Sequence, residues 1–150
     1  MNNMSWFDCK ITYEKEINQS GKMRKVSESY LVDAESFTEA ETRISEEMHS
    51  RGSYIVDSVR KVRLYELFLD DKSERYYKSK VGFITLDEKA GVEKRKFVQI
   101  IVQADDLDEA LENLHKGMKD TLGDYEVASI TETTYMDVFK YQINTGEEAK

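Results

Sequence analysis

The side chains best suited to bind a hard cation are the carboxylates of the string DDLDEALE at positions 105–112. Clustered aspartate and glutamate oxygens are the ligands that calcium and magnesium prefer. The string has a counterpart seventy residues earlier, ESFTEAET, which keeps a glutamate three places after a serine and lacks most of the other carboxylates. A capping residue followed three places later by glutamate is typical of a helix N-terminus. We therefore interpret both strings as helix caps, and the sequence predicts neither a metal site nor a cofactor.

The other reactive side chains are one cysteine, Cys9, and two histidines, His49 and His115. Cys9 lies on the apolar face of a predicted strand, and a buried thiol away from positive charge is usually inert. Neither histidine belongs to an HxxxH or HExxH pair that would hold zinc. The chain also lacks the glycine-rich motifs of nucleotide-binding proteins and the GxSxG motif of hydrolases. The sequence thus predicts no catalytic residue, and an enzyme of unknown class is only the third alternative.

Basic side chains gather beside two predicted hairpins, while the predicted helices are acidic. Further lysines and two aromatic rings lie on strand faces that point away from the helices. Cations beside stacking rings are a feature of single-strand binders, and aromatic and arginine residues also dominate protein hot spots. Alternatively, the charges only solvate the turns, and the rings pack between two halves of the molecule. The candidate binding surface comprises Trp6, Lys10, Lys22, Arg24, Lys25, Tyr76, Lys78, Lys80, Lys94, Arg95 and Lys96.

The composition restricts the class of protein. The chain has 150 residues, of which 39% are hydrophobic, enough for the core of one domain. Its formal net charge of −8 opposes loose binding to polyanions and anionic membranes. A single cysteine excludes an intrachain disulfide and favours a reducing cytoplasm. The first residues, MNNMSWFDCK, lack the features of a secretion signal, and no stretch is long and apolar enough to span a bilayer. We expect a cytoplasmic protein with no membrane partner.

An internal repeat runs through the chain at an offset of seventy residues. The segment FTEAETRISEEM at 37–48 corresponds to LDEALENLHKGM at 107–118, and the match continues on both sides, with one extra residue in the later loop. We therefore predict a single domain made of two repeats. Repeat 1 covers about 5–68 and repeat 2 about 76–139, with a linker at 69–75 and a flexible tail at 140–150.

Each repeat has the periodicities of two strands, a helix and a third strand. Alternating apolar residues indicate the first strand, and the loops NQSGK and EKAGV supply the glycine of a hairpin turn. One helical face is formed by Phe37, Ala40, Ile44 and Met48 in the first helix and by Leu107, Ala110, Leu111, Leu114 and Met118 in the second. A short helical turn is expected to close each repeat, at Leu64, Leu67 and Phe68 and at Tyr135, Val138 and Phe139.

These elements specify a fold class. A helix between the second and third strands makes a right-handed crossover, so these two strands should be parallel, with the first strand between them. One helix on three strands leaves too much apolar surface uncovered, so the two copies should pack around a pseudo-twofold axis. The prediction is an α+β fold, a tandem ββαβ duplication with about six strands and two main helices in a two-layer arrangement.

The segments WFDCKITYEK, SYLVDAESFTEAE, GFITLDEKAG and MDVF resemble the uncharacterised domain-of-unknown-function 4494 family of Bacteroides-type bacteria and their phages. The resemblance covers nearly the whole chain. It implies a bacterial or phage origin, but it supplies no activity and no site residue.

The sequence favours a non-enzymatic binding or adaptor protein that holds a protein partner or a second copy of itself. The alternative is a single-stranded nucleic-acid-binding protein that uses the sheet face and the basic hairpins.

Overall fold

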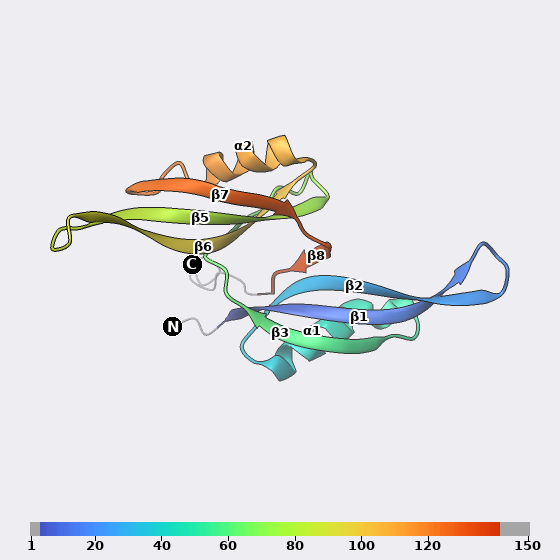
Figure 1. Ribbon diagram of the computed structural model, residues 1–150. Helices are drawn as coiled ribbons and strands as arrows, with labels where there is room; N and C mark the ends of the chain where they lie inside the picture. Colours follow the sequence, from blue (N-terminus) through green and yellow to red (C-terminus); the bar gives the residue numbers. More distant parts are fainter. Residues whose placement is uncertain (1–3, 142–150) are drawn as a thin grey trace, which may run out of the picture. The chain divides into compact units, whose positions relative to one another are not determined.

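The computed structural model describes residues 4–141, which form two compact units with one four-stranded sheet and one α-helix each (Figure 1). Unit 1 takes the described residues up to Arg63 and those from Tyr135 onward, and unit 2 is Leu64–Thr134. The fold class is α+β, as predicted. In chain order the elements are β1 (Ser5–Ile17), β2 (Lys22–Ala34), α1 (Phe37–Met48), the 3-10 helix η1 (His49–Arg51), β3 (Ile55–Val62), β4 (Glu66–Phe68), β5 (Arg75–Asp87), β6 (Val92–Ala104), α2 (Leu107–Gly117), β7 (Asp124–Glu132) and β8 (Tyr135–Phe139).

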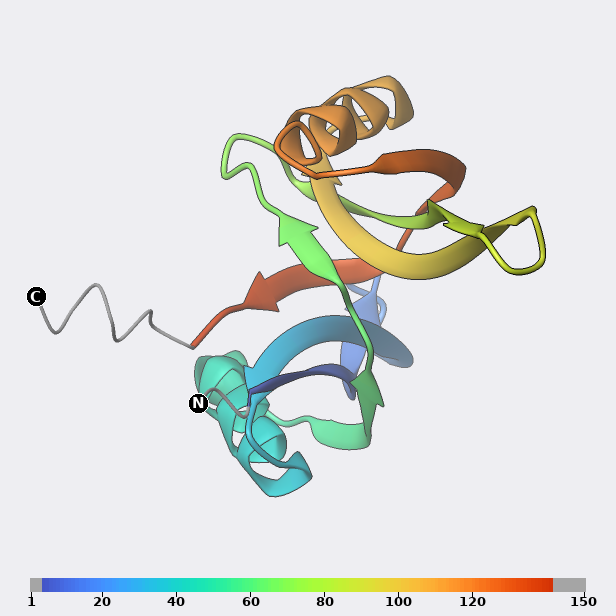
Figure 2. The same cartoon turned by 90° about the vertical axis from the view of Figure 1, so that its left-hand side faces the viewer.

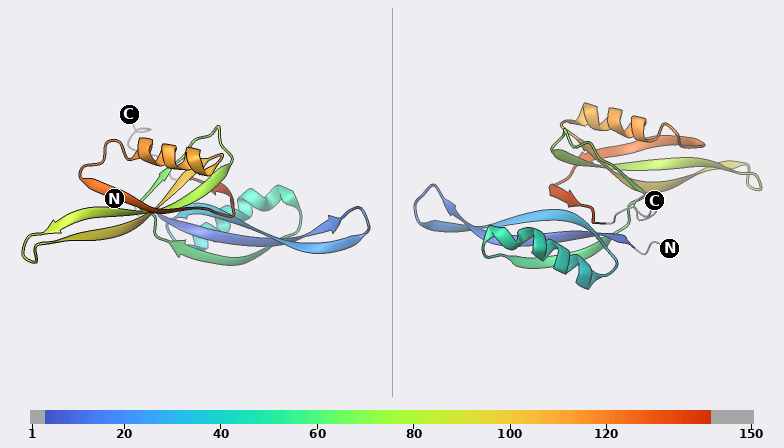
Figure 3. Two further views of the ribbon diagram at one scale, coloured as in Figure 1. Left: turned by 45° about the horizontal axis from the view of Figure 1, so that its top comes forward. Right: turned by 180° about the vertical axis from the view of Figure 1, so that it is seen from behind.

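Two long antiparallel hairpins, β1–β2 and β5–β6, form the centre of the two sheets. The predicted glycines lie in their turns with positive φ angles, 81° at Gly21 and 66° at Gly91, which residues with a Cβ rarely adopt. In each unit the helix covers one face of the sheet, and the outer part of the hairpin extends beyond the helix (Figure 3). We call the opposite face of each sheet its helix-free face.

The strand order is β3-β1-β2-β8 in unit 1 and β4-β6-β5-β7 in unit 2. The first strand of each repeat lies between the second and the third and is antiparallel to both. The second and third strands therefore run in the same direction, as the crossover rule predicted.

The two segments expected to form helical turns are strands, so this prediction was wrong. β4 pairs in parallel with β6, and β8 pairs in parallel with β2 (Figure 2). Each short strand thus completes the sheet formed by the other repeat. Apolar residues spaced by three or four positions do not distinguish one helical turn from a short strand. These two segments become strands because the edges of β2 and β6 offer them backbone hydrogen-bond partners. The described residues therefore form eight strands instead of about six.

Both helices begin with the predicted caps. The Ser36 hydroxyl accepts a hydrogen bond from the Glu39 N–H at 3.1 Å, and the Asp106 carboxylate accepts one from the Glu109 N–H at 2.8 Å. Each glutamate in turn accepts from the backbone N–H four residues before it. Two reciprocal capping boxes confirm the interpretation of the acidic strings.

The helices bury a narrower face than the sequence suggested. The fully buried positions are Ala40, Ile44 and Met48 in unit 1 and Ala110 and Leu114 in unit 2, with Met118 2% exposed. Phe37 and Leu107 are each 54% exposed and Leu111 is 39% exposed, so these three residues of the predicted helical face lie at its exposed margin. A short helix lying on a sheet needs only one residue per turn or fewer in the core, which leaves the flanking apolar positions exposed.

The segment expected to begin the flexible tail is packed at its start. The Tyr141 N–H donates to Asp33 Oδ1 at 2.6 Å, and the Arg43 guanidinium lies 4.8 Å from the centroid of the Tyr141 ring. The remaining part of the predicted tail, 142–150, lies outside the described residues. In the predicted linker, the buried Ser73 donates through its hydroxyl to Glu109 at 2.9 Å, which attaches this segment to unit 2.

Candidate functional site

The unit 1 residues of the predicted binding surface lie on two different faces. Trp6 and Lys10 project from β1 on the helix-free face, where Trp6 is half-buried and Lys10 is exposed. Lys25 lies on the same face farther along the hairpin, whereas the alternation of β2 turns Lys22 and Arg24 to the opposite face. Unit 1 therefore does not bring the predicted cations together.

In unit 2, part of the predicted surface does come together. Lys78, Lys80 and Arg95 lie on the helix-free face of β5 and β6, whereas Lys94 and Lys96 turn to the other face. Tyr76 is on the helix-free face but only 6% exposed, so its ring does not offer the stacking surface that the sequence suggested.

An exposed ring that the sequence analysis did not select, Phe97, lies among these cations. The Lys80 ammonium lies 4.5 Å from the centroid of the Phe97 ring, which is a cation–π contact. The ring lies across Gly82, where a Cβ would come within 2.9 Å of Phe97 Cε1. Gly82 thus allows a half-exposed aromatic ring to lie against the sheet beside Lys80.

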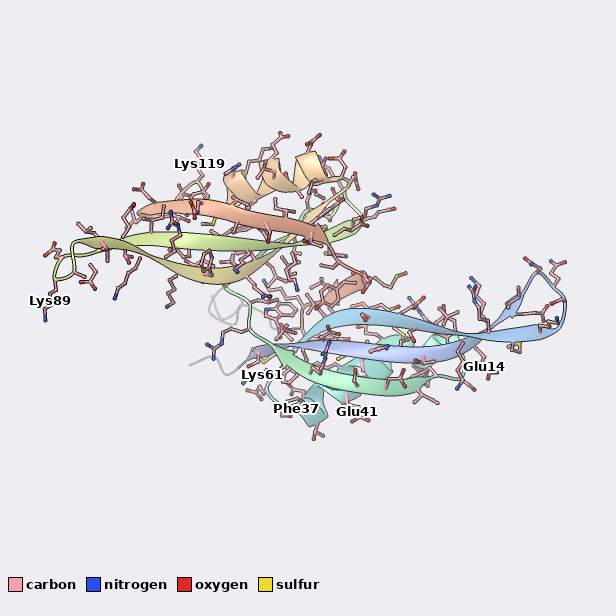
Figure 4. All side chains as sticks on the ribbon, in the orientation of Figure 1. Glu14, Phe37, Glu41, Lys61, Lys89 and Lys119 are labelled. Carbon is pink, nitrogen blue, oxygen red and sulfur yellow. The ribbon has the colours of Figure 1, made fainter. Side chains whose placement is uncertain are left out.

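Several of the predicted cations are already paired. Lys94 contacts Asp87 at 2.9 Å, and this hydrogen bond lowers the pKa of the Asp87 carboxyl. Arg95 contacts Glu126 on β7 at 2.5 Å. For Lys22, Arg24 and Lys25, no carboxylate of the described residues lies within 4 Å. Lys89, at the tip of the β5–β6 hairpin, is labelled in Figure 4.

A groove of about 690 Å³ runs between α2 and β7 in unit 2. From α2 it is lined by Leu107, Leu111 and His115, which recur every four residues along one side of the helix, and by Asp108. The His115 Nδ1 atom lies 2.8 Å from the hydroxyl of Tyr125 on β7. The β7 lining consists of Tyr125, Glu126, Val127, Ser129 and Ile130. The lining thus contains aliphatic side chains from both α2 and β7, and β7 is the last strand of its sheet.

The pocket beside α1 in unit 1 is lined mainly by polar residues of the helix. It has a volume of about 720 Å³, and its lining consists of Thr38, Glu41, Thr42, Ser45, Glu46, His49 and Tyr54. At the offset of seventy residues, Glu41 stands where unit 2 has Leu111, and Ser45 stands where unit 2 has His115. Figure 4 labels Glu41 and Phe37 on α1, and the Phe37 ring lies edge-on to the Phe7 ring, with 5.0 Å between the centroids.

The residues with nucleophile or ligand chemistry do not form a reactive centre. Cys9 is fully buried, and burial, with smaller effects from Asp8 and Glu41, raises the pKa of its thiol to about 12. In the described part of the chain, no three His, Cys, Asp or Glu side chains are arranged to hold a metal ion. Within residues 4–141, neither α-helix is long and apolar enough to cross a membrane.

The sequence contained a signal for the groove that helical periodicity obscured. Leu111 fits the apolar face of α2, but the internal repeat pairs it with Glu41, a residue that a buried position would not accept. The same alignment pairs Leu107 with Phe37, so position 107 carries no such signal. For Phe97, the signal is the polar Gln99 two positions later. Residues two positions apart in a strand share a face, so a polar Gln99 indicates that this face is exposed.

Two comparisons with known proteins bear on the chain. A family model described as Domain of unknown function (DUF4494) matches residues 5–141. The comparison with curated proteins gave no match.

Proposed function

The chain belongs to the Domain of unknown function (DUF4494) family, and we propose that it is a non-enzymatic binding protein of a bacterial or phage cytoplasm. Its binding site for a protein partner is the α2–β7 groove of unit 2. The bacterial or phage origin rests on the family resemblance.

The observation that carries this proposal is the exposed apolar lining of the groove. The fold does not require a leucine at position 111, because unit 1 builds the same elements with Glu41 at the equivalent position. Leucine side chains left exposed gain about 1.5–3 kcal/mol each when they are fully buried. Leu107 and Leu111 are 54% and 39% exposed, so a protein that covers them would gain about half of this free energy for each leucine.

The state of Cys9 supports both a binding role and the cytoplasm. A thiol whose pKa is raised by burial is protonated at neutral pH, and the protonated thiol is a poor nucleophile. A free buried cysteine also fits a reducing compartment.

Photo-crosslinking tests the protein-binding role. The residue p-benzoylphenylalanine is placed at position 111 or, as the matched control, at position 41, and the chain is irradiated in a lysate of its source organism. We expect a protein adduct from position 111 and none from position 41. The adduct is then identified by mass spectrometry, purified, and shown to bind the unmodified chain but not Leu111→Glu. If position 111 yields no adduct, or position 41 yields the same one, the proposed function is wrong.

A second candidate function, single-stranded nucleic-acid binding, has one observation in its favour. Lys80 lies over the exposed Phe97 ring on the helix-free face of unit 2, with Lys78 on the same strand. Bases stack on such rings while lysines contact phosphates. The net charge of −8 and the pairing of Arg95 with Glu126 oppose it.

Titration of a labelled oligothymidylate at two salt concentrations tests this candidate. Phosphate contacts release counterions, so binding should weaken steeply as salt rises and should be lost in Phe97→Ala. Lys89→Ala is the control, because Lys89 lies at the hairpin tip, away from this ring. Binding that Phe97→Ala leaves unchanged would exclude this face.

We also propose that the two repeats arose by tandem duplication. The strand registers support this. β1 pairs Ser5 with Ala34, and β5 pairs Arg75 with Ala104, an offset of seventy residues at both positions. The irregularity between Lys10 and Ile11 recurs at the same offset in β5.

A further inference from the structure

We propose that the occupant of the α2–β7 groove is an extended protein segment that adds to β7 as a further strand. Apolar side chains at every second position would face α2, with lysine or arginine between them. This inference rests on the proposed function and names the partner's conformation and charge.

The outer edge of β7 is suited to pairing with another strand. β7 pairs with β5 on one side and is the last strand in the order β4-β6-β5-β7. The outermost strand of a sheet leaves half of its backbone N–H and C=O groups without a strand partner. Extended peptides commonly bind by pairing with such an edge, where main-chain hydrogen bonds provide affinity and pockets select alternate side chains.

An irregularity in β7 increases the apolar surface beside this edge. Lys80 pairs with Ser129 and Val81 with Val127, so Ala128 is an extra residue in the strand. As a result, Val127 and Ile130 both pack on the helix side, although they are three positions apart.

The spacing of the groove matches the side-chain repeat of a strand. Leu107 and Leu111 are four residues apart, so they are separated by about 6 Å along the helix axis. Alternate side chains of a strand are separated by about 6.8 Å. α2 runs along β7 in Figure 1, so a strand added beside β7 would place successive apolar side chains next to Leu107 and Leu111.

The charges beside the groove select a basic segment. The lining includes Asp108 and Glu126 and no lysine or arginine. In the register of β7, Asp124 and Glu126 fall on the helix-free side of the strand, and Glu126, which also borders the groove, is paired with Arg95 at 2.5 Å. Among the described residues, no lysine or arginine nitrogen lies within 4 Å of Asp108 or Asp124. Residues directly opposite on neighbouring strands lie about 5 Å apart, so a lysine or arginine of the added strand would face Asp124.

The probe for this inference is a fluorescein-labelled octapeptide in which lysine alternates with valine. One control peptide has the same composition with the four lysines and the four valines in separate blocks. A second control replaces every lysine with glutamate. Binding to the full chain is followed by fluorescence anisotropy. Circular dichroism checks the fold of each protein variant.

We expect the alternating peptide to bind and both control peptides to bind at least about tenfold more weakly. Leu111→Glu, which carries the unit 1 residue, should weaken binding by about tenfold or more, because one leucine contact is lost and a valine of the peptide would cover a charged carboxylate. Glu41→Leu should leave the affinity unchanged. The β7 amide hydrogens should exchange more slowly in the complex. The inference is overturned if the block peptide binds as tightly as the alternating peptide, or if Leu111→Glu binds the alternating peptide as tightly as the unmodified chain does. Either result would mean that the binding is non-specific charge attraction.

The two experiments separate this inference from the proposed function. If position 111 crosslinks to a protein but the alternating peptide does not bind, or if the crosslinked segment is helical or acidic, the inference fails and the proposed function stands. If neither experiment detects binding, both fail. Concentration-dependent self-association that Leu111→Glu abolishes would identify the occupant as a second copy of this chain and overturn the inference of a separate basic partner.

Discussion

Unit 1 and unit 2 place the same kinds of element in corresponding positions, but they line the groove beside the helix differently. Glu41 and Ser45 make the groove polar in unit 1, and Leu111 and His115 stand at the equivalent positions of unit 2. Glu41 and Leu111 are both exposed, so neither side chain belongs to the buried core of its unit. The difference indicates that the chemistry at these positions was selected by something other than the core.

The units also differ in how they hold the chain that follows the exchanged strand. After β8, the Tyr141 N–H donates to Asp33 Oδ1 at 2.6 Å, and Arg43 lies 3.5 Å from the same oxygen. After β4, the Asp70 N–H donates to Gln103 Oε1 at 2.9 Å, and Asn113 donates to the Gln103 carbonyl at 3.0 Å. In unit 1 a buried carboxylate and a cation thus hold this segment. In unit 2 a neutral amide side chain holds the equivalent segment. The charged arrangement should be the more sensitive to loss of one member.

The largest expected effect tests what the units share. Ile44→Asp and Leu114→Asp each place a charge at a fully buried helix position, which costs several kcal/mol, so both variants should unfold or melt at a much lower temperature. Thermal melting by circular dichroism measures this, with the exposed Thr42→Asp as the control. An unchanged melting midpoint for either core variant would mean that its helix face is assigned wrongly.

The next effect separates the charged from the neutral arrangement. Arg43→Ala removes the cation that lies 3.5 Å from the Asp33 carboxylate, 2% exposed, and the hydrogen bond that Arg43 donates to the Asp33 carbonyl, and it should lower the free energy of unfolding by about 3 kcal/mol. Asn113→Ala removes one hydrogen bond to a carbonyl and should cost about 1 kcal/mol. Urea denaturation of both variants provides the comparison. Equal losses would show that the charge in unit 1 has no special cost.

Alkaline pH should destabilise unit 1 selectively. Burial raises the pKa of Cys9 from 9.0 to about 12, and burial followed by the hydrogen bond to Glu28 raises the pKa of Tyr30 from 10.0 to about 12. Between these values the folded chain holds more protons than the unfolded chain, so stability should be unaffected below about pH 9 and should fall as the pH rises toward 12. The equivalent residues of unit 2, Ser79 and Ile100, do not titrate in this range.

The fluorescence of Trp6, the single tryptophan, follows unit 1 during this alkaline titration. Cys9→Ser and Tyr30→Phe should each shift the unfolding midpoint to higher pH. A midpoint that neither substitution moves would show that other groups cause the alkaline unfolding.

The smallest expected effect concerns the groove. Exchanging its key residues, as Glu41→Leu and Leu111→Glu, should change the free energy of unfolding by no more than about 0.5 kcal/mol, because both side chains lie outside the core. Chemical denaturation of the two variants checks this. A large loss in Leu111→Glu would mean that Leu111 belongs to the core and that the apolar groove is a folding feature.

The sequence predicted the elements whose evidence is local. The glycines of the turns at Gly21 and Gly91, the caps at Ser36 and Asp106, and the alternation of the long strands all act within a few residues of each other. The central place of the first strand followed from the handedness of a crossover. Of the candidate site, the sequence selected Lys78 and Lys80 but missed Phe97 and Leu111, because helical and strand periods do not specify how much of a face is covered.

The sequence by itself determined two hairpins, two capped helices and the order of three strands in each sheet, because hydrogen bonding and apolar periodicity specify these over short distances. Only the tertiary structure decided where β4 and β8 pair. Their partners, β6 and β2, lie far away in the sequence, and any strand with unpaired backbone groups could accept them. The exposure of Leu111 was decided in the same way, since the width of the buried helix face depends on the sheet against which the helix packs.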